Sequence, residues 1–304
     1  MIDIIMAAYN GAEYIGEQIE SILASSEQDF RLLIYDDGSQ DETAGIVKNY
    51  AGKYPGKLFY FYNENRFGHC ANFLQGLVRA RNEYPADYYM FSDQDDLWLK
   101  DKISICLERI KDYSSPCMVF TDAMLVDADA NPLGMTLLGA DRLNTAGTDL
   151  AHLLMENKCQ GCTLMINSAL AAMVDKFDDR VRYHDWWIAL IASAFGNIVF
   201  IDTPTLMHRQ HESNVVGQKS FSGYLAGRIS KGAADSKERL KATYRQAAAF
   251  YKYYGKQMSR KDKKLVHEFV MLPKMNAAQK RTALVKYGFL KSGMIRNIGL
   301  MIYV

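Results

Sequence analysis

Three acidic residues crowd into one short polar segment, Ser92–Asp96, directly after an apolar run. The carboxylates of Asp93, Asp95 and Asp96 repel one another, which disfavours this arrangement unless a cation is shared. A few hard oxygen ligands suit Mg²⁺ or Mn²⁺, because these ions complete their shells with water and substrate phosphates. The segment therefore predicts a divalent-metal site, with a solvated acidic turn as the alternative.

A second acidic segment, 36–43, has the sequence Asp-Asp-Gly-Ser-Gln-Asp-Glu-Thr. A carboxylate here could accept a hydrogen bond from the imide N–H of a pyrimidine base or from a ribose hydroxyl. The alternative is a helix N-terminus with Ser39 or Asp41 as its cap, which needs no ligand. Both interpretations can hold together, with Asp37 facing a ligand and Asp41 capping the helix.

Two later segments place histidine beside other reactive groups. In 184–187, Asp185 stands beside two indoles at a predicted helix start, where it could act as a general base against a flat sugar platform. The alternative is that Asp185 caps the helix and the tryptophans fill the core. In 208–211, a neutral imidazole of His208 or His211 could be the third protein ligand of the metal, and Arg209 could pair with a diphosphate, unless these side chains are simply exposed.

The first 125 residues are predicted to alternate between strands and helices, and the acidic segments 36–43 and 92–96 each follow a predicted strand. Apolar residues spaced as Ile15, Ile19 and Ile22 predict a helix between two strands, and the same alternation continues to about residue 125. Such a chain forms a mostly parallel sheet covered by helices, and ligands bind beyond the carboxyl ends of its strands. Three polar segments, 9–11, 36–39 and 92–96, fall at the carboxyl ends of predicted strands. The expected strands are 2–7, 32–35, 58–62 and 88–91.

The rest of the chain is less regular and then becomes helical. Short strands are expected near Val119, Thr163 and Ile198, and a helix over about 185–195. From Gln218 onward the apolar spacing predicts only helices. We therefore expect two regions, a catalytic domain over 1–217 and a basic helical region over 218–304.

Together these segments resemble the family 2 glycosyltransferases of the GT-A fold, over roughly residues 1–217. The combination of Ser-Asp-Gln-Asp-Asp, His-Asp-Trp and Arg-Gln-His-x-x-Asn is most similar to the bacterial rhamnosyltransferase branch, which builds capsules, O-antigens and rhamnan polymers. The resemblance rests on Ala8-Tyr9-Asn10, Asp36-Asp37-Gly38-Ser39, Asn65-x-x-Gly68, Ser92-Asp93-Gln94-Asp95-Asp96-x-Trp98, Gly161-Cys162-Thr163, His184-Asp185-Trp186 and Arg209-Gln210-His211.

The resemblance implies a Rossmann-like sheet and a role for each of eight residues. Tyr9 and Asp37 would line the base pocket, Asn65 and Asn72 would border the nucleoside, and Asp93 would lie near the ribose. Asp95 would hold Mn²⁺ or Mg²⁺ across the diphosphate, Asp185 would be the catalytic base, and His211 would be a late metal or phosphate contact.

The same resemblance implies the reaction. A sugar, with L-rhamnose from dTDP-L-rhamnose as the first choice, would pass to a hydroxyl of a glycan or lipid-linked acceptor with inversion at the anomeric carbon. A UDP-hexose donor is the alternative within the family. Ala7 and Ala8 stand where relatives often have Thr or Ser, which removes one hydroxyl contact to the base.

Two rival functions fit the sequence less well. A nucleotidyltransferase needs a Gly-rich turn and a basic residue after its first strand, where this chain has Ala7–Gly11. An inactive scaffold at the membrane is a second alternative. It fits less well because the acidic residues of all three segments, 36–43, 92–96 and 184–187, are present.

Charge is divided unevenly along the chain. Residues 218–304 carry 19 Lys/Arg against 4 Asp/Glu, although the whole chain has a net charge of only +1. A basic region of this kind favours an anionic membrane surface, and no nucleic-acid partner is expected. Five scattered cysteines, including a structural Cys159/Cys162 pair, indicate a reducing compartment. With no secretory signal or spanning segment recognised, we expect a cytoplasmic protein with peripheral contact at the inner face of the plasma membrane.

Overall fold

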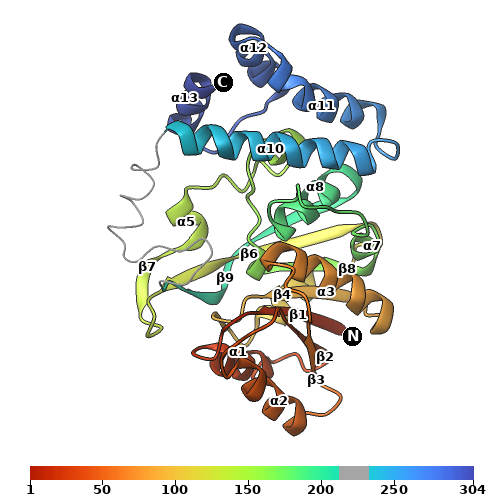
Figure 1. Ribbon diagram of the computed structural model, residues 1–304, viewed down its shortest axis with the longest axis vertical. Helices are drawn as coiled ribbons and strands as arrows, with labels where there is room; N and C mark the ends of the chain where they lie inside the picture. The colour runs from red at the N-terminus through yellow and green to blue at the C-terminus, as the bar shows by residue number, and fades with distance from the viewer. Residues whose placement is uncertain (212–232) are drawn as a thin grey trace.

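A computed structural model describes residues 1–211 and 233–304 of the chain. In Figure 1 the central sheet lies between two helical layers, with α1 and α2 on one side and α3, α7 and α8 on the other. The strands are β1 (Ile2–Ala8), β2 (Phe30–Asp36), β3 (Leu58–Tyr62), β4 (Tyr88–Ser92), β5 (Leu97–Trp98), β6 (Cys117–Val126), β7 (Pro132–Thr136), β8 (Leu164–Asn167) and β9 (Asn197–Arg209).

The helices fall into two groups along the chain, before and after the residues that are not described. The first group is α1 (Ile15–Leu23), α2 (Thr43–Lys53), α3 (His69–Glu83), α4 (Lys102–Ile110), α5 (Leu137–Asp141), α6 (Leu150–Met155), the 3₁₀ turn η1 (Gly161–Thr163), α7 (Ser168–Ala171) and α8 (His184–Phe195). The second group is α10 (Ala233–Tyr254), α11 (Arg260–Met271), the 3₁₀ turn η2 (Leu272–Lys274), α12 (Ala277–Tyr287) and α13 (Met294–Tyr303).

The sheet runs in the order β3-β2-β1-β4-β8-β6-β9-β5, with β7 paired to β6. Strands β1 to β4 pair in parallel, as the alternation of strands and helices predicts. The register sets Ala8 opposite Asp36 and Met6 opposite Ser92, so the polar segments that follow these three strands emerge at one edge.

The second half of the sheet is mixed. β8 pairs antiparallel with both β4 and β6, β9 runs parallel to β6, and β5 is antiparallel to β9. The α/β class is therefore confirmed, with parallel pairing concentrated in the first four strands. Since β9 reaches Arg209, it carries the histidine-rich segment back to the edge where β4 ends.

Two hydrophobic cores cover the two faces of the sheet. Alternate residues of β1 face opposite ways, so that Ile4 packs with Ile19 of α1, and Ile5 packs with Phe73 of α3. A Cβ atom at Gly76 of α3 would lie 2.9 Å from the Tyr35 ring, so glycine lets this helix approach the sheet closely.

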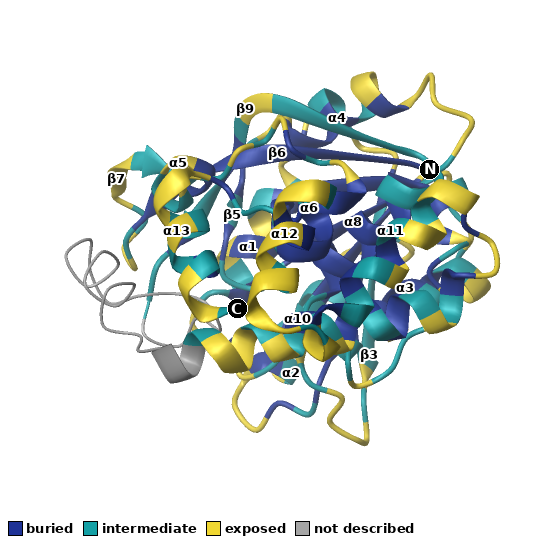
Figure 2. Ribbon diagram, turned by 90° about the horizontal axis from the view of Figure 1, so that it is seen from above, coloured by how far each residue is buried: buried dark blue, intermediate teal, exposed yellow. Residues whose placement is uncertain are grey.

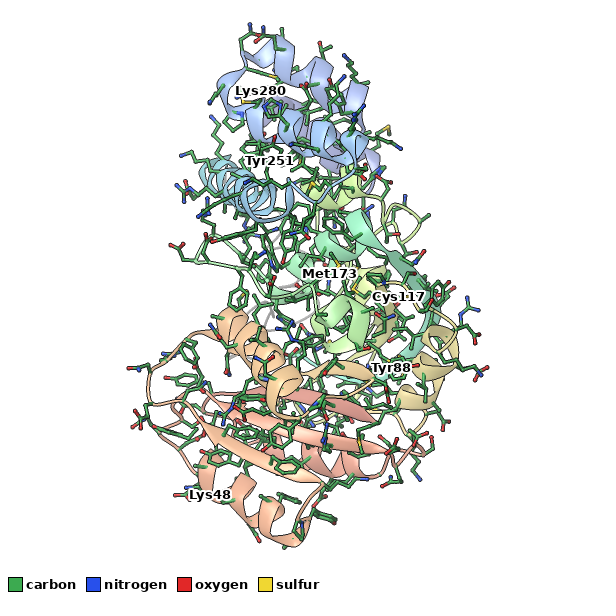
Figure 3. All side chains as sticks on the ribbon, turned by 90° about the vertical axis from the view of Figure 1, so that its right-hand side faces the viewer. Lys48, Tyr88, Cys117, Met173, Tyr251 and Lys280 are labelled. Atoms are coloured by element: carbon green, nitrogen blue, oxygen red, sulfur yellow. The ribbon has the colours of Figure 1, made fainter. Side chains whose placement is uncertain are left out.

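The C-terminal helices belong to the larger of these cores. The Trp187 ring of α8 lies 5.7 Å from Phe250 and 5.9 Å from Tyr254 of α10, and the Tyr254 hydroxyl donates to the Met173 carbonyl at 2.7 Å. In Figure 3, Lys48 of α2 and Lys280 of α12 lie at opposite ends of the molecule, with Met173 between them.

The predicted helical character of the C-terminal region is confirmed for residues 233–304. The expected boundary between residues 217 and 218 lies outside the described residues, so the division into two domains stays a prediction. Among the described helices, none is long and apolar enough to cross a membrane.

Candidate active site

A cavity of about 370 Å³ lies at the edge of the sheet where β1, β2 and β4 end, and residues near the start of α8 form its opposite wall. Sequence analysis expected eight site residues, and two of them do not line this cavity: Asn65, which is exposed, and His211, which contacts a lining residue. The other six line it: Tyr9, Asp37, Asn72, Asp93, Asp95 and Asp185.

Asp37 is bound by the chain itself. Its carboxylate accepts hydrogen bonds from the backbone N–H of Phe67 at 2.8 Å and of Gly68 at 2.7 Å, and its side chain is buried. The Asn63 amide, rather than that of Asn65, donates to Asp37 at 3.3 Å and to Asn72 at 2.9 Å. Asp37 therefore shapes the wall of the cavity by holding the loop before α3.

The wall beside Asp37 also carries an arginine that sequence analysis missed. The guanidinium of Arg66 lies 3.7 Å from the centre of the Tyr9 ring. Gln94 exchanges two hydrogen bonds with the backbone of Tyr9, at 2.9 and 3.1 Å, and thereby joins the end of β1 to the acidic segment. Glycine at position 11 leaves room for this arrangement, because a Cβ there would lie 2.2 Å from the Gln94 side chain, which would have to move.

Each of the three clustered aspartates is paired with a histidine instead of with its neighbours. His69 lies 3.3 Å from Asp93, and His211 lies 2.9 Å from Asp95. Burial lowers the pKa of His69, but the hydrogen bond and charge of Asp93 outweigh burial and raise the pKa above its ordinary value. Two of these carboxylates, Asp93 and Asp95, line the cavity.

The third carboxylate, Asp96, turns into the protein interior. It is buried, and its Oδ1 atom lies 2.7 Å from Nδ1 of His208. Burial opposes protonation of His208, but the charge of Asp96 outweighs it and holds the pKa well above the ordinary value. Together with Cys162 this pair forms a compact cluster of possible metal ligands. His208 lines the cavity, whereas the buried Asp96 does not, and the two side chains are joined directly by their hydrogen bond.

Arg209 does not line the cavity. Its buried guanidinium donates to Glu17 at 2.7 Å and to the backbone carbonyls of Asp95 and Ala128. In this arrangement the expected pairing of Arg209 with a diphosphate is wrong. Its side chain instead holds the backbone of segment 92–96 from the side that faces away from the cavity. Arg66 is the arginine that faces the cavity.

Asp185 is the second residue of α8, and Tyr183 is the residue at the N-cap position. Asp185 is therefore not the N-cap residue itself, but it does bind an N–H group of the first helical turn. Its carboxylate accepts from the N–H of Trp186 at 2.6 Å and from that of Gly161 at 3.0 Å. Burial raises its pKa to about 6, although these hydrogen bonds favour the charged form. The group is thus mostly ionised at neutral pH and still basic enough to accept a proton.

The two tryptophans beside Asp185 do not form a sugar platform. Both are buried, and their indole N–H groups donate to backbone carbonyls, Trp186 to Leu153 at 2.6 Å and Trp187 to Lys176 at 3.2 Å. The expectation that these rings fill the core is the correct one. Tyr9 and Tyr183 are the large aromatic side chains of the cavity wall.

His184 is a further cavity residue whose importance the sequence did not indicate. Its ring stacks on Phe73 at 4.0 Å, and within the described structure neither ring nitrogen has a hydrogen-bond partner. Burial first, and the charge of His69 second, hold its pKa well below the ordinary value. A Cβ at Gly161 would lie 2.5 Å from Nε2 of His184, which explains a glycine at that position.

Asp95 and His211 together fit a divalent ion. Their facing atoms, Oδ2 and Nε2, are 2.9 Å apart. Neighbouring ligands of an octahedral ion with bonds of about 2.1 Å lie about 3 Å apart. A carboxylate beside an imidazole is a donor pair that suits Mn²⁺.

Comparison with known proteins agrees with this geometry. Residues 3–173, more than half of the chain, match the model of glycosyl transferase family 2. The chain belongs to this family. The dTDP-rhamnosyl transferase RfbG of Shigella flexneri is 30% identical over 223 residues, which cover 70% of the chain and 73% of that protein. The resemblance to the rhamnosyltransferase-like branch is therefore confirmed.

Solved structures of glycosyltransferases share the fold. TarS of S. aureus, solved with UDP-GlcNAc, has a TM-score of 0.61 at 16% identity, covering 94% of this chain and 80% of that one. The mannosyltransferase PcManGT of Pyrobaculum calidifontis, solved with GDP-Man and Mn²⁺, has a TM-score of 0.57 at 15% identity, covering 99% and 78%. These likenesses confirm the GT-A fold for this family 2 glycosyltransferase.

Proposed function

We propose that this glycosyltransferase transfers L-rhamnose from dTDP-L-rhamnose to a hydroxyl of a glycan or lipid-linked acceptor, with inversion, in the synthesis of a cell-surface polysaccharide. The observation that carries the proposed chemistry is the position of Asp185, a buried carboxylate with a pKa of about 6 that faces the same cavity as Asp93 and Asp95. The identity with RfbG supports the choice of donor.

The donor would lie along the wall formed by Tyr9, Asp37 and Asn72. The loop that Asp37 holds carries Arg66, whose positive charge at the cavity favours a diphosphate. Asp95 and His211 would hold Mn²⁺ or Mg²⁺. When bound, such an ion stabilises the negative charge that develops on the leaving nucleoside diphosphate.

Asp185 would act as the general base. The backbone N–H groups of Gly161 and Trp186 each bind one of its two oxygens and hold the carboxylate in one orientation. The carboxylate can therefore accept a proton without first having to rotate. The carboxylate takes the proton from the acceptor hydroxyl as that oxygen attacks the anomeric carbon. Attack from the side opposite the diphosphate inverts the anomeric centre.

The excess of basic residues in 218–304 supports binding of the enzyme to an anionic membrane surface, where lipid-linked acceptors are found. We place the enzyme at the cytoplasmic face of the plasma membrane on this ground.

A thermal-shift screen with dTDP-L-rhamnose, UDP-glucose and UDP-GlcNAc, each with and without MnCl₂, tests the donor. A ligand at about 100 times its Kd adds about 2.7 kcal/mol to the free energy of unfolding. We expect the largest Mn²⁺-dependent shift with dTDP-L-rhamnose. A clearly larger shift with a UDP-sugar would replace the rhamnosyl assignment by the UDP-hexose alternative.

The scaffold alternative makes a different prediction. An inactive homologue has no need of an ionisable buried carboxylate in its cavity, and burial of that charge is unfavourable. Slow Mn²⁺-dependent hydrolysis of the donor, absent in the Asp185→Asn, Asp95→Ala double variant, would exclude the scaffold.

A further inference from the structure

The five most exposed large hydrophobic side chains of the described residues all lie on the last two helices. Each exposes more than half of its surface, although the same helices also bury apolar residues in the core. We call these five the α12–α13 apolar surface: Val285, Met294, Ile295, Ile298 and Ile302.

The spacing of these residues on α13 makes one continuous face. Ile295, Ile298 and Ile302 follow at i, i+3 and i+7, so they point the same way. Leu300, on the opposite side of the helix, is buried in the core. α13 is therefore apolar on both sides, and only one side is covered. Figure 2 shows α12 and α13 beside each other, with exposed segments on both.

Hydrogen bonds join the two helices and fix them to the catalytic part of the protein. The Arg281 guanidinium of α12 donates to the Met301 carbonyl of α13 at 2.9 Å, and Val285 follows one turn after Arg281. Arg296 of α13 forms an ion pair with Glu156 at 2.7 Å. The next residue after Glu156, Asn157, lines the cavity. The apolar surface is thus held in a fixed orientation relative to the active site.

The charged residues on α12, on α13 and between them all have one sign. Residues 269–304 contain six Lys/Arg and no Asp or Glu. Lys286 is exposed next to Val285, and Lys280 lies at the far end of the molecule in Figure 3. A second copy of this chain would bring like charges together across the same surface, which is unfavourable. A lipid layer with anionic headgroups offers both an apolar interior and opposite charge.

We propose that the α12–α13 apolar surface inserts into the headgroup region of an anionic membrane and holds the active site beside a lipid-linked acceptor. The placement beside a lipid-linked acceptor rests on the proposed function, whereas the insertion into the membrane does not. The proposal also distinguishes α13 from α11, where Lys261, Lys263 and Lys264 are exposed but no large apolar side chain is exposed beside them.

Point variants of the full chain test the proposal, because deletion of these helices would expose the core that they share with α8. The test variant replaces Ile295, Ile298 and Ile302 by serine. The control variant, Lys261→Gln, Lys263→Gln, Lys264→Gln, removes three charges from α11. Binding is measured by co-sedimentation with vesicles of 30% phosphatidylglycerol in phosphatidylcholine and with vesicles of phosphatidylcholine alone.

We expect the wild type to prefer the anionic vesicles and the serine variant to bind them at least about tenfold more weakly. The α11 control should lose less than about threefold. Wild-type binding by the serine variant would overturn the proposal, and so would a dimeric wild type that becomes monomeric in this variant without losing vesicle binding. Transfer to a soluble acceptor should be unchanged in the serine variant, so failure of the membrane proposal is separable from failure of the proposed reaction.

Discussion

The polar residues around the cavity fall into two sets that differ in how their side chains are paired. In the first set, the side chains of Asp37, Asn72 and Gln94 already bond to other parts of the chain. In the second set, Asp95 faces a histidine, and His184 has no partner for either ring nitrogen among the described residues. Groups with complete internal bonding hold the shape of a site, whereas groups with exchangeable partners can take up a ligand. Substitutions should therefore reduce stability in the first set and activity in the second.

The largest effect is expected in the second set, from Asp95→Ala. Loss of the carboxylate that faces His211 should lower donor turnover on the order of a thousandfold and remove the Mn²⁺-dependent part of nucleotide binding. The melting temperature should stay close to that of the wild type. Turnover is measured with Mn²⁺ present and absent, with the exposed Asp101→Ala as a control. Wild-type turnover by Asp95→Ala would exclude a metal role for this segment.

Asp185→Asn should lower transfer at least about a hundredfold, because an amide cannot accept the proton of the acceptor. Donor affinity and melting temperature should remain near wild-type values, since the amide oxygen still accepts one backbone hydrogen bond. Initial rates of transfer and nucleotide titrations measure the two quantities separately. Near-normal transfer would make Asp185 a structural residue and leave the base unassigned.

In the first set, Asp37→Ala should act mainly on stability. It leaves the N–H groups of Phe67 and Gly68 without their acceptor, which should lower the free energy of unfolding by about 2–4 kcal/mol. The matched control is Asn65→Ala, at an exposed position of the same loop, which should change it by less than about 0.5 kcal/mol. Urea unfolding measures both. If the two variants are equally stable, Asp37 does not shape the loop.

The pH dependence of stability should report the buried charge of Asp185. Its pKa rises from 3.8 to about 6 on folding, so the folded state favours the protonated form. The stability that this group contributes is complete below pH 4 and is lost as the pH rises toward 6, by up to about 3 kcal/mol. Wild type should therefore lose stability relative to Asp185→Asn between pH 4 and 7. A constant difference in urea unfolding over that range would contradict the raised pKa.

The smallest effect should be a gain of stability in the second set. His184→Phe replaces a buried ring with two unpaired nitrogens by an apolar ring that can stack on Phe73. The free energy of unfolding should rise by about 1 kcal/mol while transfer falls. Thermal unfolding and initial rates measure the two effects. A less stable variant would mean that His184 has a partner that the described residues do not reveal.

Local patterns in the sequence were sufficient to predict the first half of the fold. Period-two apolar runs and helical spacing are set by neighbouring residues, so β1 to β4, α1 and α8 could be located. The polar segments at the strand ends, and the family resemblance that they carry, located six of the eight expected residues at the cavity wall. Gly161 could have been singled out, because it belongs to the Gly-Cys-Thr motif that supports the resemblance.

Contacts between distant parts of the chain could not be predicted in this way. The histidines that pair with Asp95 and Asp96 lie 116 and 112 residues later in the chain, and the pairing of β9 with both β5 and β6 brings them together. The sequence by itself determined the elements, the acidic segments and the family, since these depend on local spacing. Only the tertiary structure decided which two of the three clustered aspartates face the cavity, that the tryptophans are buried, and that α13 leaves one apolar face uncovered. Burial and pairing depend on packing between segments far apart in the chain.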